Sequence, residues 1–325
     1  MLNNQLTISI IAPIYGVEKF IARFADSVLS QSYPHIEYIF VNDGTRDKSI
    51  EVLETRIREK YEYRRTQIKI INKENEGLPA ARMTGIEHAT GDYVYHVDPD
   101  DWIEPNSIAK IAARIEETNA DIVYFNYIKD YPDHSKSKRE QTFDYNGNIY
   151  KDIHERYRYI HNMFNGRAIV YVWNKCIRRS LYTNNEIFFS PYGYAEDAYL
   201  ITQLVGYSHT IAGLDEYVYH YQKGNNPLAL TAQKRKNRKM EYCLNYIDLY
   251  ERYCNIPADV HPLSMMCDEI ALKVGWYSLI YRLGLFDKSS ILASAVLKAH
   301  ISRKSRVWVL AQLFTKMYAY LHLKL

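Results

Sequence analysis

Three aspartates crowd a single step of the chain at Asp98, Asp100 and Asp101, with Glu104 close behind. Carboxylates packed this closely repel one another, so a bound divalent cation, a basic partner or a shared proton is needed to balance them. A cap for the helix expected next needs only one carboxylate, and Asp101 is suited to that role. The others predict an oxygen-ligand site for Mg²⁺ or Mn²⁺, completed by phosphate oxygens and water from a bound substrate.

A calcium loop of the helix–loop–helix type is the alternative metal site at this step. Such a loop needs a glycine where this chain has Ile103 and a closing carboxylate where it has Ala109. We therefore exclude the calcium loop.

Strand-like and helical segments alternate over the first 130 residues and must position these carboxylates. This βαβα order predicts an α/β fold with a doubly wound, mostly parallel sheet flanked by helices. The expected strands are residues 6–12, 36–41, 67–71, 92–97 and 121–127, and the expected helices are residues 17–30, 48–61, 79–89 and 105–117.

Polar or aromatic residues follow three of the expected strands. Pro13 and Tyr15 lie at the end of the first, Asp43 at the end of the second, and Asp98 at the end of the fourth. Ligands of such sheets collect at the carboxyl ends of the strands, so we expect these residues to line one crevice. The alternative for Asp43, followed by Gly44, is a turn that caps the next helix.

The length of 325 residues and a hydrophobic content of 47% suit one sizeable domain with a substantial appendage. We expect a domain at 1–225, with a nucleotide-binding half at 1–130 and an acceptor half at 131–225, where 130–150 forms a loop or hairpin. The pattern of 226–325 predicts a helical C-terminal region. The formal net charge of +3 gives no basic footprint for nucleic acid, so we expect no nucleic-acid partner.

The four cysteines form no CxxC pair and no metal-ligand spacing, which predicts reduced thiols. The first residues lack a basic region followed by a long apolar stretch, and no apolar run approaches the roughly eighteen residues of a membrane span. Both features favour a cytoplasmic protein.

Five motifs follow one another in register between residues 6 and 222. Their order and spacing resemble those of family two glycosyltransferases with the GT-A fold. The motifs are Ile11-Ala12-Pro13-Ile14-Tyr15, Val41-Asn42-Asp43-Gly44-Thr45, Asn75-Glu76-Gly77-Leu78-Pro79-Ala80-Ala81-Arg82, Thr84-Gly85-Ile86 and Asp98-Pro99-Asp100-Asp101.

The resemblance implies a donor site for a nucleotide sugar, with roles carried over residue by residue. The residue matching Asp43 contacts the nucleotide base, the one matching Asp98 contacts the ribose, and the one matching Asp100 binds the metal. Pro13 and Tyr15 would wall the base.

Arg82 follows Gly77-Leu78-Pro79, which has the composition of a helix entrance. Free backbone N–H groups and the helix dipole favour phosphate oxygens there, and an arginine in the first turn adds a bidentate clamp. The alternative is a solvated helix arginine. Met83 and Pro79 depart from the asparagine and serine that the family usually has, which weakens the expectation of base or sugar contacts nearby.

Transfer of a sugar by single displacement requires a carboxylate that takes the proton of the acceptor hydroxyl. The stretch around Glu196 and Asp197 resembles the family's Glu-Asp motif opening a helix, which nominates Asp197 as the base. Neighbouring residues on a helix point about 100° apart, so the two are not expected to face the same atom. Glu196 is assigned an acceptor-orienting role. The alternative is that both acids only cap and charge the helix start.

Two further candidates carry weaker signals. His220 could complete the metal shell, as a late histidine does in some GT-A enzymes, or could be a strand histidine with ordinary hydrogen bonds. Trp173-Asn174-Lys175-Cys176 resembles a segment that often lines the acceptor side, although Trp173 could equally be core. The segment 303–325 combines basic residues with an aromatic and aliphatic face. It could contact a membrane surface peripherally, pack on its own protein or join a homodimer.

The resemblance implies a metal-dependent inverting glycosyltransferase, which we expect in the cytoplasm, with the inner membrane surface as the alternative if 303–325 binds lipid. It would move a sugar from a nucleotide diphosphate donor, a UDP-sugar, to a hydroxyl of a glycan or lipid-linked acceptor in cell-surface polysaccharide synthesis. A nucleotidyltransferase or phosphohydrolase would also use strand-end carboxylates with Mg²⁺, but gives Glu196 and Asp197 no role. A nucleotide-sugar binding protein without turnover is the third alternative.

Overall fold

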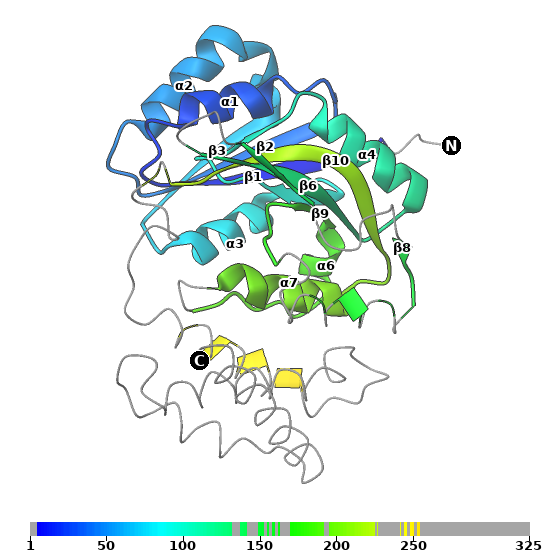
Figure 1. Cartoon of the computed structure of the whole chain (residues 1–325). Coiled ribbons are helices and arrows are strands. Elements are labelled where there is room, and N and C mark those ends of the chain that lie inside the picture. Colours follow the sequence, from blue (N-terminus) through cyan, green and yellow to red (C-terminus); the bar gives the residue numbers. More distant parts are fainter. Residues whose placement is uncertain are drawn as a thin grey trace, which may run out of the picture.

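Helices cover both faces of a single sheet in the computed structural model of the chain (Figure 1). The structure describes residues 5–131, 137–141, 149–152, 170–191, 195–224 and 226, and single positions at 155, 158, 159, 162, 241, 244, 245, 248, 249, 252 and 253. Its elements are β1 (Ile8–Ile14), α1 (Ile21–Leu29), β2 (Ile36–Asp43), α2 (Ser49–Lys60), η1 (Glu62–Gln67), β3 (Ile68–Lys73), α3 (Leu78–His88), β4 (Tyr93–His96), β5 (Trp102–Ile103), α4 (Ser107–Thr118), β6 (Ile122–Asp130), β7 (Lys138–Glu140), β8 (Ile149–Tyr150), β9 (Lys175–Arg178), α6 (Arg179–Thr183), α7 (Glu196–Tyr207) and β10 (Ile211–Gln222).

The strands of the described part lie in the order β3-β2-β1-β4-β9-β6-β10-β5, with β7 beside β6 and β8 beside β10. β1 pairs in parallel with β2 and β4, β2 with β3, and β6 with β10. β9 lies between β4 and β6 and runs antiparallel to both. The predicted α/β fold with a mostly parallel sheet is therefore confirmed, although the sheet is mixed.

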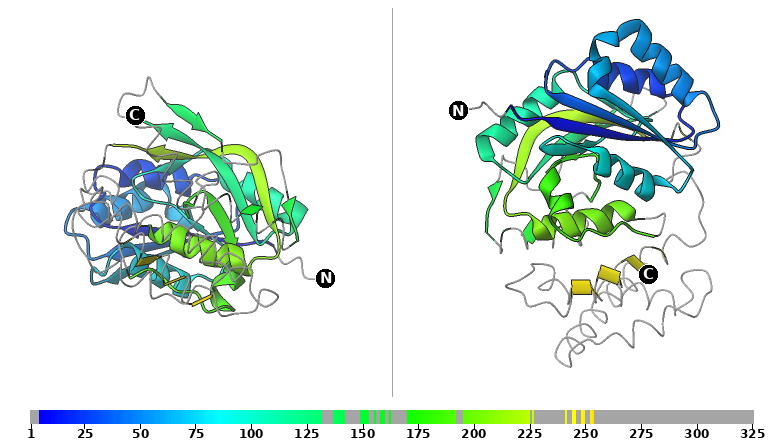
Figure 2. Two further views of the ribbon diagram at one scale, coloured as in Figure 1. Left: turned by 60° about the horizontal axis from the view of Figure 1, so that its bottom comes forward. Right: turned by 180° about the vertical axis from the view of Figure 1, so that it is seen from behind.

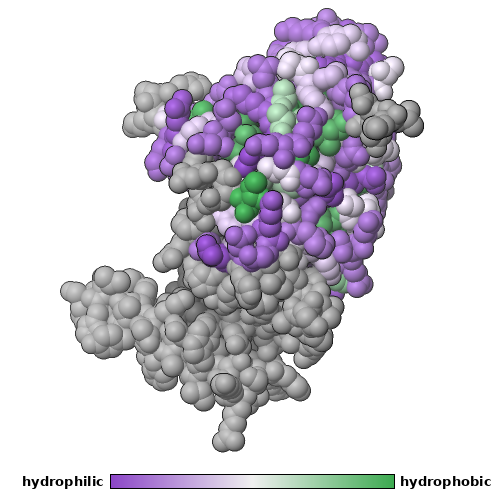
Figure 3. All heavy atoms as spheres, turned by 90° about the vertical axis from the view of Figure 1, so that its right-hand side faces the viewer, coloured by the Kyte–Doolittle hydropathy of each residue, from purple (hydrophilic) through white to green (hydrophobic). Residues whose placement is uncertain are grey.

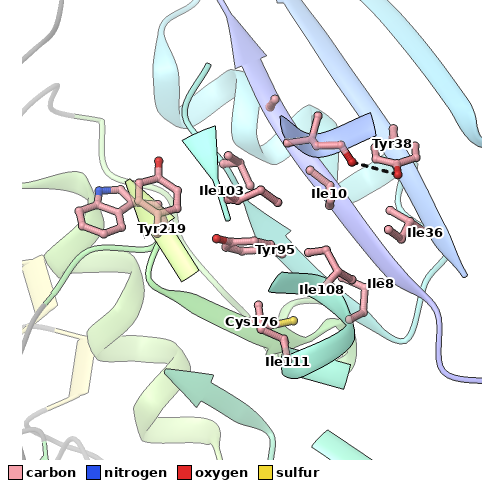
Figure 4. Packing of buried hydrophobic residues seen from close by; sticks show 14 of the residues in the cluster. Ile8, Ile10, Ile36, Tyr38, Tyr95, Ile103, Ile108, Ile111, Cys176 and Tyr219 are labelled. Atoms are coloured by element: carbon pink, nitrogen blue, oxygen red, sulfur yellow. Dashed lines mark hydrogen bonds between the residues drawn. The ribbon is translucent and has the colours of Figure 1, made fainter. Parts of the chain in front are cut away.

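The helices form two layers, which Figures 1 and 2 show from several sides. α1, α2 and α4 cover one face, and α3, α6 and α7 cover the other. Each face has its own core because the strands are buried on both sides. Figure 4 shows part of the first core, where Ile8 and Ile10 of β1 lie near Tyr95 and Ile108.

The second core brings α3 unusually close to β1. Gly85 makes this approach feasible, because a Cβ atom there would lie 2.3 Å from Cγ2 of Ile11. Ala81 and Ile86 of α3 join α7 residues such as Leu204 in this core. The same packing sets the position of Arg82 beneath the carboxyl end of the sheet.

β10 is the longest strand described and bends across the sheet (Figure 1). Its register against β6 shifts between Leu214 and Tyr217 and again before Tyr219. Such irregularities bend a strand and redirect its side chains. The far end of β10 then pairs with β5, with Tyr219 opposite Ile103 and His220 opposite Trp102.

Most of the predicted helical region 226–325, including the segment 303–325, lies outside the described residues. Among the single positions that are described, Leu249 and Tyr253 are buried in the core formed with α7. Cys176 is a buried free thiol, and the other three cysteines lie outside the described part. The face shown in Figure 3 is mainly hydrophilic, with small hydrophobic groups between polar side chains. No described helix is long and apolar enough to span a membrane.

Candidate functional site

The carboxyl ends of β1, β2 and β4 meet at one edge of the sheet, as predicted. Ile14 at the end of β1 pairs with Asn42 at the end of β2, and Ile11 pairs with His96 at the end of β4. Pro13 is buried in β1, whereas Tyr15 beyond it is 47% exposed. The structure therefore places the predicted base-wall residues at the edge that carries the carboxylates.

Asp43 ends β2 and is only 3% exposed. Its Oδ1 accepts hydrogen bonds from the Glu76 backbone N–H (3.1 Å) and from Nζ of Lys73 (3.2 Å), and its Oδ2 accepts one from the Gly77 N–H (2.9 Å). Gly77 precedes α3 with φ +90°, a conformation that favours glycine. Asp43 thus holds the entrance of α3, whereas the predicted alternative was a cap of the next helix, α2.

Asp101 is tied to β10. It is 1% exposed, its Oδ2 accepts the Tyr219 hydroxyl (2.7 Å), and its Oδ1 accepts the Gln222 N–H (2.6 Å). The expectation that Asp101 caps the next helix is wrong, because α4 begins only at Ser107 and the arriving strand β10 takes both oxygens. Burial raises the pKa of Asp101 well above its ordinary value.

The carboxyl groups of Asp98 and Asp100 both have raised pKa values. Burial raises the pKa of Asp98 to about 6 although Arg82 opposes the rise, and burial likewise raises the pKa of Asp100. Oδ2 of Asp100 accepts a hydrogen bond from Nδ2 of Asn226 (2.9 Å), and its backbone carbonyl accepts one from Arg23 (3.3 Å). A cation near these oxygens would favour their ionised forms, so the donor set fits a hard divalent metal.

Asp100 is the side chain of this step best suited to hold such a metal, because Asp98 already faces Arg82 and Asp101 faces β10. In the part of the chain that the structure describes, no group of three or more His, Cys, Asp or Glu side chains is placed to hold a metal ion. A metal at Asp100 would therefore need further oxygens from a bound diphosphate and water.

Arg82 lies among three carboxylates, and not at an open phosphate site. It is 2% exposed and is the fifth residue of α3, one residue further into the helix than predicted. Nη1 lies 2.5 Å from Asp197 and 3.8 Å from Glu196, and Nη2 lies 3.2 Å from Asp98. Burial lowers the pKa of Arg82, but the three negative charges outweigh that effect and raise it.

Glu196 and Asp197 open α7, as predicted, directly after Ala195 at φ +62°. Both carboxylates lie within 4 Å of Nη1 of Arg82, so the expectation that they could not face one atom is wrong. Glu196 has one more methylene group, which lets its carboxylate reach the same nitrogen from the preceding helical position. Burial and the charge of Asp197 raise the pKa of Glu196 to about 7.

Two groups to which the sequence assigned no role lie at the start of β9: Val172 just before the strand, and Lys175 as its first residue. The Val172 N–H donates to Oδ2 of Asp197 (3.3 Å). Lys175 is fully buried, and its Nζ donates to the Tyr171 carbonyl (2.8 Å) and to Oδ1 of Asn174 (2.6 Å). Burial lowers the pKa of Lys175 to about 7, although Asp197 opposes the change. The only signal for Lys175 was its place in the Trp173 segment.

Trp173 itself is 3% exposed and belongs to the core, which was the alternative considered. Its ring stacks on Tyr219 at 4.5 Å between centroids and on Tyr171 at 4.8 Å, and Tyr171 is 40% exposed. The aromatic stack therefore connects the exposed Tyr171 with Tyr219 of β10.

His220 is held by two carboxylates. Its Nδ1 lies 2.8 Å from Asp130, its Nε2 lies 2.7 Å from Glu104, and its ring stacks on Trp102 at 4.4 Å. Arg23 covers the Trp102 ring at 3.8 Å. These contacts correspond to the alternative of a strand histidine with ordinary hydrogen bonds, and they occupy both nitrogens that a metal would use.

Comparisons with known proteins agree with this arrangement. The family model described as "Glycosyl transferase family 2" matches residues 9–183, more than half of the chain. The uncharacterized glycosyltransferase EpsJ of Bacillus subtilis (strain 168) is 34% identical over 68% of this chain and 62% of its own length. The chain spans only 31% and 64% of two further curated relatives, so it covers less than two thirds of each.

Two solved structures share the fold. TarS 1-349 of S. aureus in complex with UDP-GlcNAc is 17% identical with a TM-score of 0.62, covering 95% of this chain and 80% of that one. The mannosyltransferase PcManGT of Pyrobaculum calidifontis, in complex with GDP-Man and Mn²⁺, is 13% identical with a TM-score of 0.52, covering 96% and 86%. The predicted GT-A fold is thereby confirmed.

Proposed function

The chain belongs to glycosyltransferase family 2, and from this premise we propose that it transfers a sugar from a nucleotide diphosphate donor to a hydroxyl group with inversion. The observation that carries the proposal is the arrangement of Asp98 and Asp197 around one buried guanidinium. A donor-side carboxylate and a carboxylate suited to act as a base thus lie within reach of one reaction centre.

The donor we propose is a UDP-sugar bound at the carboxyl edge of β1, β2 and β4. Pro13 and Tyr15 wall the base, Asp43 contacts it, and Asp98 contacts the ribose. Asp43 would support base binding in two ways. It would contact the base directly, and it would hold the loop before α3, because its oxygens accept the Glu76 and Gly77 N–H groups. The complex of TarS with UDP-GlcNAc supports a uridine donor for a protein of this fold.

The metal we propose is Mn²⁺ or Mg²⁺ held through Asp100, and His220 is left to its two carboxylate partners. When bound, the ion neutralises the charge that develops on the departing diphosphate. The Mn²⁺ complex of PcManGT is consistent with such a role for a relative in fold.

Asp197 is the proposed general base. The acceptor oxygen forms a bond to the anomeric carbon while its proton passes to the Asp197 carboxylate. The bond from the anomeric carbon to the diphosphate oxygen breaks, and its electron pair leaves with the diphosphate. Attack opposite the leaving group gives inversion. Glu196, with a pKa raised to about 7 by burial, is partly protonated near neutral pH and can donate a hydrogen bond that orients the acceptor.

The acceptor we propose is a glycan or lipid-linked glycan in cell-surface polysaccharide synthesis, reached from the cytoplasmic face of the membrane. We keep 1–225 as the catalytic domain and 226–325 as an accessory region, with membrane or homodimer contacts through 303–325. The packing of Leu249 and Tyr253 on α7 supports a close association of the two parts.

A thermal-shift panel tests the donor site. The full chain is heated with UDP-, GDP-, dTDP- and CDP-sugars, each in the presence of Mn²⁺ or of a chelator. We expect at least one UDP-sugar to raise the Tm with Mn²⁺ and much less with chelator. No stabilisation by any donor with metal would contradict the proposal. In a separate analysis of the products, release of pyrophosphate instead of UDP would indicate a nucleotidyltransferase.

A further inference from the structure

We propose that Arg82 is a positioning residue that fixes Asp197 relative to the donor side of the site. This inference rests on the proposed function, because it assigns Arg82 a role in placing the proposed base. It departs from the phosphate-clamp role that the sequence predicts for Arg82.

The two ends of one guanidinium serve the two sides of the site. Nη1 faces Asp197 at 2.5 Å and Nη2 faces Asp98 at 3.2 Å. A guanidinium is planar and rigid, so its width fixes the separation of the carboxylates that it holds. Asp98 follows β4 whereas Asp197 opens α7, and Arg82 contacts both carboxylates directly.

Arg82 is so deeply buried that little of its guanidinium surface is available to a phosphate. Its side chain is 2% exposed, while the side chains of Asp98 and Asp197 are 24% and 14% exposed. Its Nε is buried without a hydrogen-bond partner in the part of the chain that the structure describes. A phosphate clamp presents its nitrogens to the ligand, but here the carboxylates stand between the guanidinium and solvent.

The charges around Arg82 make its position specific. Three carboxylates, those of Asp98, Glu196 and Asp197, lie within 4 Å of a single cation. Removal of that cation would leave buried like charges that repel one another. The Val172 N–H would then be the remaining described hydrogen-bond donor to the side chain of Asp197. Asp197 would lose its fixed orientation, and misplacement of a catalytic group by about 1 Å can cost 100-fold in rate.

The test is a double-mutant cycle of Arg82→Lys and Asp197→Asn in the full chain with Mn²⁺. Lysine keeps the charge, and with it the attraction for phosphate, but cannot bridge two carboxylates as a fork. UDP release is measured at saturating UDP-GlcNAc, or with the UDP-sugar that stabilises the chain most, and the Kd for UDP is measured by calorimetry.

We expect Arg82→Lys to slow turnover about 100-fold while the Kd for UDP changes less than about threefold. Because Arg82 acts through Asp197, the double variant should be no slower than Asp197→Asn alone. If Arg82→Lys instead weakened UDP binding tenfold and left saturated turnover unchanged, the result would support a phosphate-clamp role for Arg82 and contradict the inference. Losses that multiply in the double variant would equally overturn the inference.

Arg64→Lys is the matched control. Arg64 is also buried, at 9% exposure, and donates to the Gln31 carbonyl and to Oε1 of Gln67, outside the proposed site. The Arg64→Lys variant should have a lower Tm and an unchanged rate of saturated turnover. If Arg64→Lys lost as much turnover as Arg82→Lys, the loss would reflect reduced stability of the fold in both variants, and the inference would be refuted.

A structure of the unmutated chain with UDP and Mn²⁺ tests the same point without any variant. We expect Nη1 of Arg82 to stay on Asp197, with no phosphate oxygen within hydrogen-bonding distance of the guanidinium. A phosphate oxygen bonded to Arg82 would contradict the inference. If the unmutated chain neither binds UDP nor releases it from any UDP-sugar, the proposed function itself fails. If it does both and the cycle is multiplicative, only the role of Arg82 fails.

Discussion

The residues that we assign to the donor side and to the acceptor side of the proposed site are held in different ways. On the donor side, Asp43 is satisfied by the backbone of the loop that enters α3, and Asp101 is satisfied by β10. On the acceptor side, Glu196 and Asp197 lie against Arg82, which they share with Asp98 and which is 115 residues from Asp197 in sequence. Asp43 and Asp101 therefore hold the fold together, whereas the carboxylates around Arg82 concentrate buried charge.

This difference indicates that some carboxylates of the site serve the stability of the fold and others its reactivity. A carboxylate whose oxygens accept backbone N–H groups stabilises the fold, and its removal leaves buried donors unsatisfied. Buried carboxylates that compete for one cation cost stability, and such groups are typical of functional sites. Substitutions on the two sides should therefore have different signatures.

Asp197→Asn should give the largest effect on turnover. Asparagine keeps the shape of the side chain but cannot take the acceptor proton, so we expect UDP release to fall by about 100- to 10,000-fold. The Kd for UDP should change little, and the Tm should not fall, because one buried like charge is removed. Glu216→Gln, at an exposed ion pair with Lys110, is the control and should leave turnover unchanged.

Removal of the metal should abolish most of the stabilisation that UDP provides. A ligand at 100 times its Kd stabilises by about 2.7 kcal/mol, and we expect a chelator to remove most of that increment. Asp100→Asn should reproduce the loss with Mn²⁺ present, as measured by thermal shift. An undiminished shift in Asp100→Asn would exclude Asp100 as the metal ligand.

Asp43→Ala should destabilise the fold by about 2 kcal/mol in urea titration, because the Glu76 and Gly77 N–H groups lose their acceptor. It should also weaken UDP binding. Asp121→Ala is a matched control, since Asp121 accepts the His209 and Thr210 N–H groups outside the proposed site. The control should lose similar stability with an unchanged Kd. Equal weakening of UDP binding in both would remove Asp43 from the donor site.

The smallest predicted effect is a minimum of stability near neutral pH. The folded-state pKa values of Asp98, about 6, and Glu196, about 7, lie above the unfolded values of roughly 4. Their stabilising contribution is therefore complete near pH 4 and is lost as the pH rises through 6 and 7. The pKa of Lys175, lowered by burial to about 7, lies below its unfolded value of roughly 10.4, so stability is regained above pH 7.

Urea titrations between pH 4.5 and 10 would measure this profile. Glu196→Gln should flatten the falling limb, and Lys175→Met should flatten the rising limb. If neither variant changes the slope of its own limb, the assignment of these two titrations to the acceptor side is incorrect.

The sequence predicted the positions of residues at strand and helix ends better than it predicted contacts between distant segments, for a physical reason. Asp43 and Asp98 each follow a strand whose apolar residues are contiguous in sequence, and parallel strands bring their ends to one edge. The place of Glu196 and Asp197 at a helix start was also local, and the structure confirms it.

The remaining features depend on contacts between distant segments. Tyr219 and Gln222 reach Asp101 only because β10 bends and pairs with the two-residue strand β5, which has no periodicity to detect. Nothing near Arg82 in sequence shows that α7 will pack beside α3. The burial of Lys175 likewise could not be predicted from its place in the Trp173 segment, because a lysine is normally expected at the surface.

The central claim is most directly tested by UDP release from a panel of UDP-sugars with Mn²⁺, comparing the unmutated chain with Asp197→Asn. We predict slow release of UDP from at least one UDP-sugar with water as the acceptor, and a loss of about 100-fold or more in Asp197→Asn. No release from any UDP-sugar, or equal release by the two proteins, would contradict the account.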